Sequence, residues 1–110
     1  MKTRNEPFYE PPRVLAVDVD GTLFVKGRVN RLVVDFVMSQ KTAGFEIIIW
    51  SSRGTDYAKR ATAAAGLTGV ADVVTSKPGA IIDDQGWQWI KYTRVIAFDA
   101  LRRFAGLRET

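Results

Sequence analysis

The sequence predicts an α/β fold: a three-layer domain in which helices flank a mainly parallel sheet of about five strands. Short apolar runs rich in Val and Ile, typical of buried strands, alternate along the chain with amphipathic stretches of helical length. This alternation of strand, helix and strand indicates βαβ units, which build parallel sheets. In addition, polar side chains directly follow several of the predicted strands, where parallel sheets bind their ligands.

Length and composition indicate one soluble globular domain. The chain has 110 residues, of which 46% are hydrophobic and 25% charged. We expect an extended, proline-containing lead-in over residues 1–12, disordered at residues 1–5, and a single domain over residues 13–110. Cysteine and histidine are both absent, which excludes disulfides, thiolate nucleophiles, serine–histidine triads and most zinc sites. Aspartates and lysines therefore remain as the candidate acids, bases and ligands.

Charge and hydropathy suggest a partner class and a location. The net charge of +4 suits a phosphorylated or polyanionic partner, nucleic acid among them, although a small excess of this kind is usually only a solvated surface. No apolar run approaches the roughly 20 residues that span a bilayer, and residues 1–7 lack the apolar region of a secretory signal. We therefore expect a cytoplasmic protein without membrane contact.

The first half of the chain contains one predicted βαβ unit. A strand at about residues 13–18 leads into two short apolar runs over residues 23–29, which indicate a small hairpin. Asn30 is a suitable cap for a helix that runs to about Thr42 and ends at Gly44. Residues 46–51 then form a continuous apolar run, typical of a strand buried on both faces.

The second half predicts a further helix and three more strands. The helix begins at Thr55 or Asp56 and ends at Gly66, and its alanines at positions 58, 61, 64 and 65 suit close packing on a sheet. Strands are predicted at residues 70–75, 80–83 and 94–98, followed by a short basic helix over residues 101–106. Residues 85–93 fit either a short helix or a loop.

Two aspartates stand where the first strand ends. Asp18 and Asp20 are one residue apart, and Gly21 follows them. Carboxylates so close repel each other unless a cation or hydrogen-bond donors lie between them, which favours a metal site; a simple Asp-Gly turn is the alternative. A calcium loop is excluded, because Leu23 and Val29 occupy the positions that require glycine and glutamate.

Further polar residues follow the other predicted strands and should reach the same sheet edge. They are Ser51, Lys77, Asp83 and Asp84. With the first aspartates they form a set of oxygen donors and one cation, which suits a hard ion such as Mg²⁺ together with phosphate oxygens. Taken singly, each residue also has a structural interpretation: a serine that caps the next helix, a surface lysine, or a turn with two aspartates.

Four segments, in this order, resemble the motifs of the haloacid dehalogenase-like (HAD) phosphohydrolase superfamily. The first motif of that family is a hydrophobic strand followed by D-x-D-G-T, the second a hydrophobic strand ending in Ser or Thr, the third a lysine, and the fourth a hydrophobic strand ending in paired aspartates. The matching segments here are Asp18-Val19-Asp20-Gly21-Thr22, Ile47-Ile48-Ile49-Trp50-Ser51-Ser52-Arg53, Ser76-Lys77-Pro78 and Ile81-Ile82-Asp83-Asp84. The resemblance covers about residues 14–98.

The resemblance implies a Mg²⁺-dependent phosphomonoesterase that acts through an aspartyl-phosphate. Asp18 would be the nucleophile, and Asp20 would protonate the leaving oxygen and then activate water. Ser51 would donate to a phosphoryl oxygen, and Lys77 would offset the growing negative charge. The metal would be held by the Asp18 carboxylate, the Asp20 backbone carbonyl and Asp84, with Asp83 as a further candidate ligand.

The resemblance also implies a Rossmann-like core without a cap domain, because neither usual insertion point has room for one. The open site would suit phosphates on macromolecules, including nucleic acids, or would need a second subunit as a lid. Candidate substrate contacts are Gly21, Thr22, Lys26, Ser52 and Arg53.

The sequence allows two interpretations both of its basic and aromatic residues and of its function. Basic and aromatic residues at positions 26, 28, 53, 87, 89, 91, 92 and 94 can form a recognition surface for nucleic acid, or the aromatics among them can pack a sheet edge or an oligomer interface. The alternative function is a non-enzymatic module on a HAD fold that binds phosphate or nucleic acid, or regulates a partner.

Overall fold

The structure is a computed structural model that describes the backbone of residues 10–109 and the side chains of residues 10–104. The disorder expected at residues 1–5 and most of the predicted lead-in therefore lie outside the described residues. Residues 10–13 precede the first strand without regular structure and are exposed.

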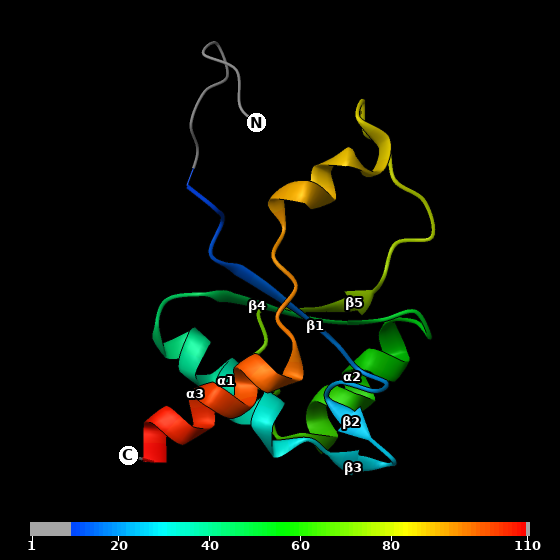
Figure 1. Ribbon diagram of the computed structural model, residues 1–110. Helices are drawn as coiled ribbons and strands as arrows, with labels where there is room; N and C mark the ends of the chain where they lie inside the picture. The colour runs from blue at the N-terminus through cyan, green and yellow to red at the C-terminus, as the bar shows by residue number, and fades with distance from the viewer. Residues whose placement is uncertain (1–9, 110) are drawn as a thin grey trace.

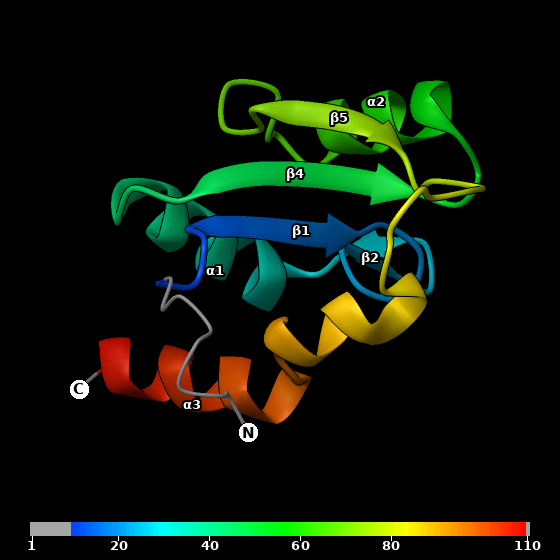
Figure 2. The ribbon, with the colours of Figure 1, turned by 90° about the horizontal axis from the view of Figure 1, so that it is seen from above.

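Three parallel strands form the sheet that positions the candidate site. They are β1 (Val14–Asp18), β4 (Glu46–Ser51) and β5 (Val73–Ser76), in the order β1-β4-β5. Asp18 pairs in register with Trp50, and Ser51 with Ser76, so the three strands end at the same edge. Figure 2 shows the three arrows pointing the same way. The α/β class and the parallel sheet are thus confirmed.

Both crossover helices cover one face of this sheet (Figure 1). These are α1 (Arg31–Thr42) and α2 (Thr55–Ala64). Both connections step in the same direction across the sheet, and right-handed crossovers of that kind place their helices on the same side. The helix α3 (Phe98–Glu109) packs along α1, where the rings of Phe36 and Phe104 meet edge to face with centroids 5.2 Å apart.

The core lies between the sheet and these helices. Ile47 and Ile49 of β4 are fully buried there, whereas Ile48 and Trp50 alternate to the opposite face and are partly exposed. The expectation that this strand is buried on both faces is therefore wrong. On the opposite side stands the 3₁₀ helix η1 (Gly86–Tyr92), away from the sheet and beyond the β1 edge (Figures 1 and 2), so the expected three packed layers are not seen in the described residues.

The predicted hairpin and the predicted ends of α1 are confirmed. Strands β2 (Phe24–Val25) and β3 (Arg28–Val29) pair antiparallel, and both residues of the tight turn between them, Lys26 and Gly27, have positive φ. The Asn30 side chain accepts a 3.2 Å hydrogen bond from the Leu32 amide and caps α1 as predicted. In α2, three of the four alanines expected to pack inward are buried, but Ala64 is exposed.

Two predicted strands are absent from the structure. Residues 80–83 and 94–98 do not pair with the sheet, β5 covers only Val73–Ser76, and the last helix begins at Phe98 rather than at Leu101. The chain leaves the sheet at Pro78, which lacks an amide donor, and continues past β1 without pairing. An apolar run predicts a strand only where the fold offers it a partner, and here Ile82 is fully exposed instead.

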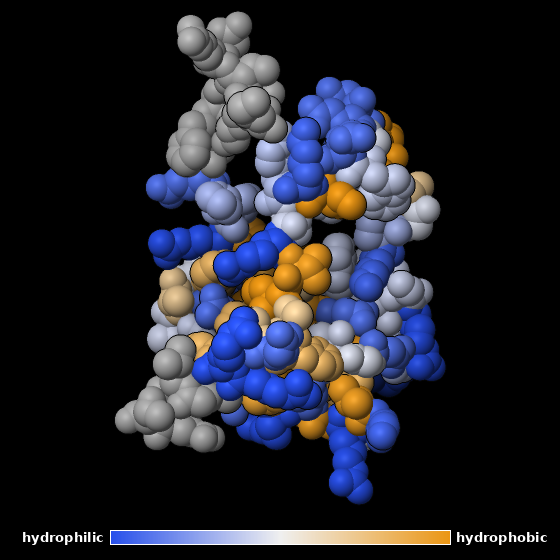
Figure 3. Space-filling view, in the orientation of Figure 1, coloured by the Kyte–Doolittle hydropathy of each residue, from blue (hydrophilic) through white to orange (hydrophobic). Residues whose placement is uncertain are grey.

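Residues 78–95 form an exposed segment that stands off from the rest of the molecule. Every residue in it is exposed. Figure 3 shows a hollow between this part and the body of the protein. The segment carries several large apolar side chains: Ile81, Ile82, Trp87, Trp89, Ile90, Tyr92 and Val95. The aromatic residues of the predicted recognition surface are therefore not part of the core.

No helix within residues 10–109 has the length and apolar character that a membrane crossing requires.

Candidate active site

The D-x-D segment is held in place by its central residue. Val19 is fully buried, as is Leu23 four residues later, and together they anchor the turn that follows β1. Asp18 lies on the sheet face opposite the helices, beside Trp50, and Asp20 projects from the turn as an exposed residue. The alternation of one inward and two outward side chains explains why the carboxylates are separated by one residue.

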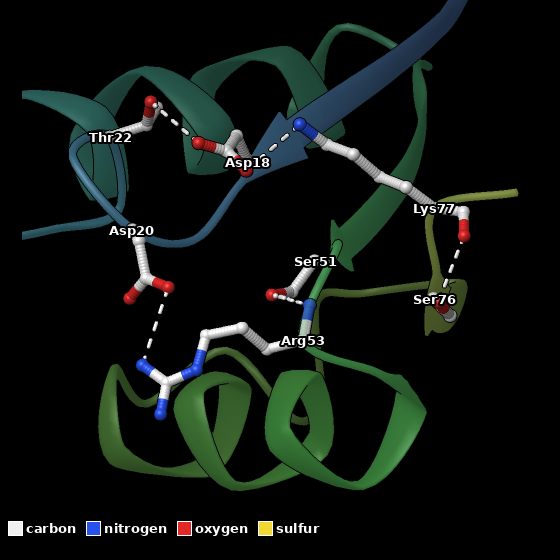
Figure 4. A network of polar contacts seen from close by, with 7 residues as sticks. All are labelled: Asp18, Asp20, Thr22, Ser51, Arg53, Ser76 and Lys77. Atoms are coloured by element: carbon white, nitrogen blue, oxygen red, sulfur yellow. Dashed lines mark hydrogen bonds and ion pairs between the residues drawn. The ribbon is translucent and has the colours of Figure 1, made fainter. Parts of the chain in front are cut away.

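Asp18 has hydrogen-bonding partners on both carboxylate oxygens (Figure 4). The Lys77 ammonium lies 3.1 Å from Oδ1, and the Thr22 hydroxyl donates to Oδ2 at 3.4 Å. Lys77 Nζ also lies 5.9 Å from the centroid of the Trp50 ring, so this face holds a cation between a carboxylate and an aromatic ring. Two of the predicted catalytic residues, from the first and third motifs, are thereby brought together.

Lys77 is placed by the sheet. Its backbone amide donates to the Ser51 carbonyl at 3.0 Å, which continues the β4–β5 ladder one residue past the end of β5. The position of the lysine thus follows from the strand register, as expected for a residue at the carboxyl edge of a parallel sheet.

Ser51 is a buried hydroxyl at the same edge, only 2% exposed. Its Oγ accepts a 3.0 Å hydrogen bond from the Arg53 amide, whereas the N-cap of α2 is Gly54. Ser51 therefore does not cap that helix. Within residues 10–109 no acceptor takes the Ser51 hydroxyl proton, so the hydroxyl can still donate to a ligand.

Asp20 has a different set of partners. The Tyr57 hydroxyl donates to Oδ1 at 2.5 Å, and Arg53 Nη1 lies 3.5 Å from Oδ2. The Arg53 guanidinium also lies over the Tyr57 ring, 3.9 Å from its centroid. The hydrogen bond to the Asp20 carboxylate raises the pKa of the Tyr57 hydroxyl above 10.0, because ionisation would place two negative charges side by side.

Tyr57 is the site residue that the motif series did not indicate. It lies in the first turn of α2, which begins at the same sheet edge as the polar strand ends. Helix first turns at that edge are as close to the site as the strand ends themselves, so the predicted start of the helix at Thr55 or Asp56 is the one sequence signal that points to Tyr57.

The remaining predicted substrate contacts have less defined positions. The Gly21 and Thr22 amides already donate to the carbonyls of Phe24 and Val19, so the turn itself uses the backbone donors of these two candidate contacts. Lys26 and Ser52 are exposed and have no hydrogen-bonding partner among the described residues.

Asp83 and Asp84 are not brought to this site. Both lie in the exposed segment, where Asp83 Oδ1 accepts a 2.8 Å hydrogen bond from the Gln85 amide and stabilises a local turn. No group of three or more acidic, histidine or cysteine side chains within the described residues could hold a metal ion.

The donors of the site suit Mg²⁺ in their chemistry, but their arrangement does not form its site. Asp18 supplies hard carboxylate oxygens, and both of them are engaged by Lys77 and Thr22. The acidic ligands expected from the fourth motif lie in the exposed segment. The described arrangement therefore places the Lys77 ammonium against the first aspartate.

The geometry nevertheless separates the two aspartates by environment. Asp18 is partly buried and paired with a lysine at 3.1 Å, whereas Asp20 is exposed, hydrogen-bonded to a neutral phenol and only loosely paired with Arg53, at 3.5 Å. Two carboxylates in different surroundings can serve different purposes, one as a charge-neutralised nucleophile and one as a proton carrier.

Comparisons of the chain with protein-family models, with curated proteins and with solved structures return no match.

Proposed function

We propose that the protein is a HAD-type phosphomonoesterase with Asp18 as its nucleophile. The observation that carries this proposal is the Asp18 carboxylate at the end of β1, ion-paired with Lys77 at 3.1 Å. A carboxylate attacks a phosphate ester only if the repulsion between the two anions is offset, and a fixed ammonium group supplies part of that charge. The buried Ser51 hydroxyl, with its proton free, lies at the same edge.

The reaction would have two steps. In the first, Asp18 attacks phosphorus, the ester bond to the leaving oxygen breaks, and Asp20 gives that oxygen a proton. In the second, Asp20 takes a proton from water, which attacks the aspartyl-phosphate and releases inorganic phosphate and the Asp18 carboxylate. Lys77 and Ser51 would stabilise the charge on the phosphoryl oxygens in both steps.

The proposal includes Mg²⁺ as the cofactor. The ion would neutralise charge between the carboxylate nucleophile and the phosphate, with Asp18, the Asp20 carbonyl and Asp84 or Asp83 as its ligands. For this the exposed segment would have to approach Asp18. Mixing the protein with chelator, and separately the Asp84→Asn substitution, should then lower activity strongly; undiminished turnover in chelator would show that Lys77 suffices.

The open site and the surface charge support phosphorylated macromolecules, nucleic acid ends among them, as substrates. Arg53 has a side chain 63% exposed beside Asp20, within the reach of an incoming phosphate. A second subunit could complete the site as a lid.

The deciding experiment is a phosphatase screen with Mg²⁺ on nucleotides, sugar phosphates, phosphopeptides and phosphate-ended oligonucleotides. The Asp18→Asn variant should lose activity by roughly 10³-fold or more, because an amide is a poor nucleophile. Asp35→Asn, an isosteric change at an exposed aspartate on α1, should retain it. Chelator-sensitive phosphatase activity that survives in Asp18→Asn would overturn the assignment.

A second candidate is a phosphate- or nucleic-acid-binding module without turnover. The observation in its favour is that Asp83 and Asp84 lie apart from Asp18 in the described structure. Salt-dependent binding of oligonucleotides together with no release of phosphate from any substrate in the screen would select this candidate.

A further inference from the structure

The Tyr57 side chain is anchored in the body of the protein, whereas its hydrogen-bonding partner, the Asp20 carboxylate, lies at the surface. Its ring packs against the hydrophobic core, and the next residue in α2, Ala58, is fully buried. Asp20, in contrast, lies on an exposed turn, where a carboxyl group can rotate about its terminal bond. The 2.5 Å hydrogen bond from the Tyr57 hydroxyl to Oδ1 therefore joins an exposed carboxylate to the rigid part of the molecule.

We propose that Tyr57 is a positioning residue that occupies Oδ1 of Asp20 and so directs the exchangeable proton to Oδ2. This inference rests on the proposed function. When Asp20 is protonated, Oδ1 still accepts from Tyr57 and the acidic hydrogen resides on Oδ2, which is the oxygen left for the leaving group. Tyr57 takes part in this hydrogen bond only as the donor.

Arg53 contacts both residues of this pair, the Asp20 carboxylate and the Tyr57 ring. A guanidinium has only donors, so its contact with Oδ2 is strong while Asp20 is ionised and weakens when Oδ2 carries a proton. Its contact with Oδ2 is long, 3.5 Å, whereas its stacking on the Tyr57 ring at 3.9 Å does not depend on that oxygen. Arg53 can therefore release Oδ2 and remain stacked on Tyr57, close to an incoming phosphate.

The test uses the dependence of the rate on the leaving group. Loss of an alkyl alcohol from a phosphate ester needs an acid, whereas para-nitrophenolate is stable enough to leave without one. Because kcat/KM reports the steps up to loss of the leaving group, Tyr57→Phe should lower kcat/KM for an alkyl phosphate by about tenfold or more and change it less than about twofold for para-nitrophenyl phosphate.

Two further variants exclude a merely structural effect. Ser39→Ala removes one hydroxyl that is hydrogen-bonded within α1 and should leave both substrates unaffected. In an Asp20→Asn background, Tyr57→Phe should cause no additional loss on the alkyl substrate, since its effect passes through Asp20.

The outcomes separate this inference from the proposed function. Equal losses on both substrates, or losses that multiply with those of Asp20→Asn, would overturn the role of Tyr57 while the wild-type activity stands. A wild-type protein that cleaves neither ester, with Mg²⁺ present, would overturn the proposed function and this inference with it.

Discussion

The Asp72 carboxylate connects three elements of this fold that are distant in sequence: the end of α1, the strand β4 and the start of β5. Asp72, just before β5, receives a 2.7 Å contact from the Lys41 ammonium at the end of α1 and a 2.7 Å hydrogen bond from the Ile47 amide in β4. Both donors stabilise the ionised form, so the pKa of Asp72 lies below its ordinary 3.8, first because of Lys41 and then because of the Ile47 amide.

This shift predicts a pH-dependent contribution to stability. A folded-state pKa below the unfolded one means that the stabilisation is present above about pH 4 and is lost as the pH falls through the folded value. Asp72→Ala should therefore lower the melting temperature at pH 7, and the gap to wild type should narrow towards pH 3. Asp35→Ala, which removes an exposed 3.6 Å ion pair with Arg31, should change little at any pH. A gap that stays constant with pH would contradict the prediction.

The sequence predicts the positions of site residues that follow strands better than the positions of site residues on helices. Asp18 and Lys77 meet at the sheet edge because strand register alone places them there. Tyr57 could not be found in this way, because its contact with Asp20 depends on the angle at which α2 leaves that edge. The final positions of Asp83 and Asp84 depend on chain packing beyond their own motif.

Among the elements, the β2–β3 hairpin carries the clearest local strain. Lys26 adopts φ of 52° at the first position of its two-residue turn, a left-handed conformation that disfavours most side chains, and Gly27 follows with φ of 74°. Asn-Gly is the pair that suits such a turn best.

Lys26→Asn should consequently stabilise the protein, by about 0.5–1 kcal/mol, because asparagine tolerates the left-handed conformation better than lysine. Urea unfolding measures the change. Lys59→Asn is the matched control: it removes the same charge from an exposed position inside α2, where asparagine is a poorer helix former, and should be neutral or destabilising. Equal effects of the two substitutions would show that charge, and not backbone conformation, is responsible.

Elements defined by local signals are predictable from the sequence, whereas those defined by a distant partner are not. The Asn30 cap and the tight hairpin turn depend on neighbouring residues alone, and both are confirmed. The run at residues 80–83 has the composition of a strand but no partner, since β1 pairs only with β4 among the described residues. Composition therefore could not decide its structure.

For the whole molecule, the main feature is the contrast between a packed body and the exposed segment at residues 78–95. The body places its buried side chains between the sheet and the helices, while the segment buries none of its residues. Regions with few buried contacts open at low free-energy cost.

Limited proteolysis with trypsin should therefore cut after Lys91 or Arg94 before any site in α1 or α2. Mass spectrometry of the early fragments identifies the order. Lys59 and Arg60, exposed but inside a regular helix, serve as the internal comparison. Protection of Lys91 and Arg94 to the same degree would mean that the segment is covered in solution, either by the β1 edge or by a second chain.

The exposed segment is attached to the body at both ends. The Lys77 amide bonds to the Ser51 carbonyl before it, and Leu101 is buried after it. For a loop closed between fixed ends, the entropy of closure rises only with the logarithm of length, by about 0.6 kcal/mol for each doubling. Additional residues, or even a whole inserted domain, can thus be accommodated here with little loss of stability. This is the position at which the protein can gain new parts without refolding its core.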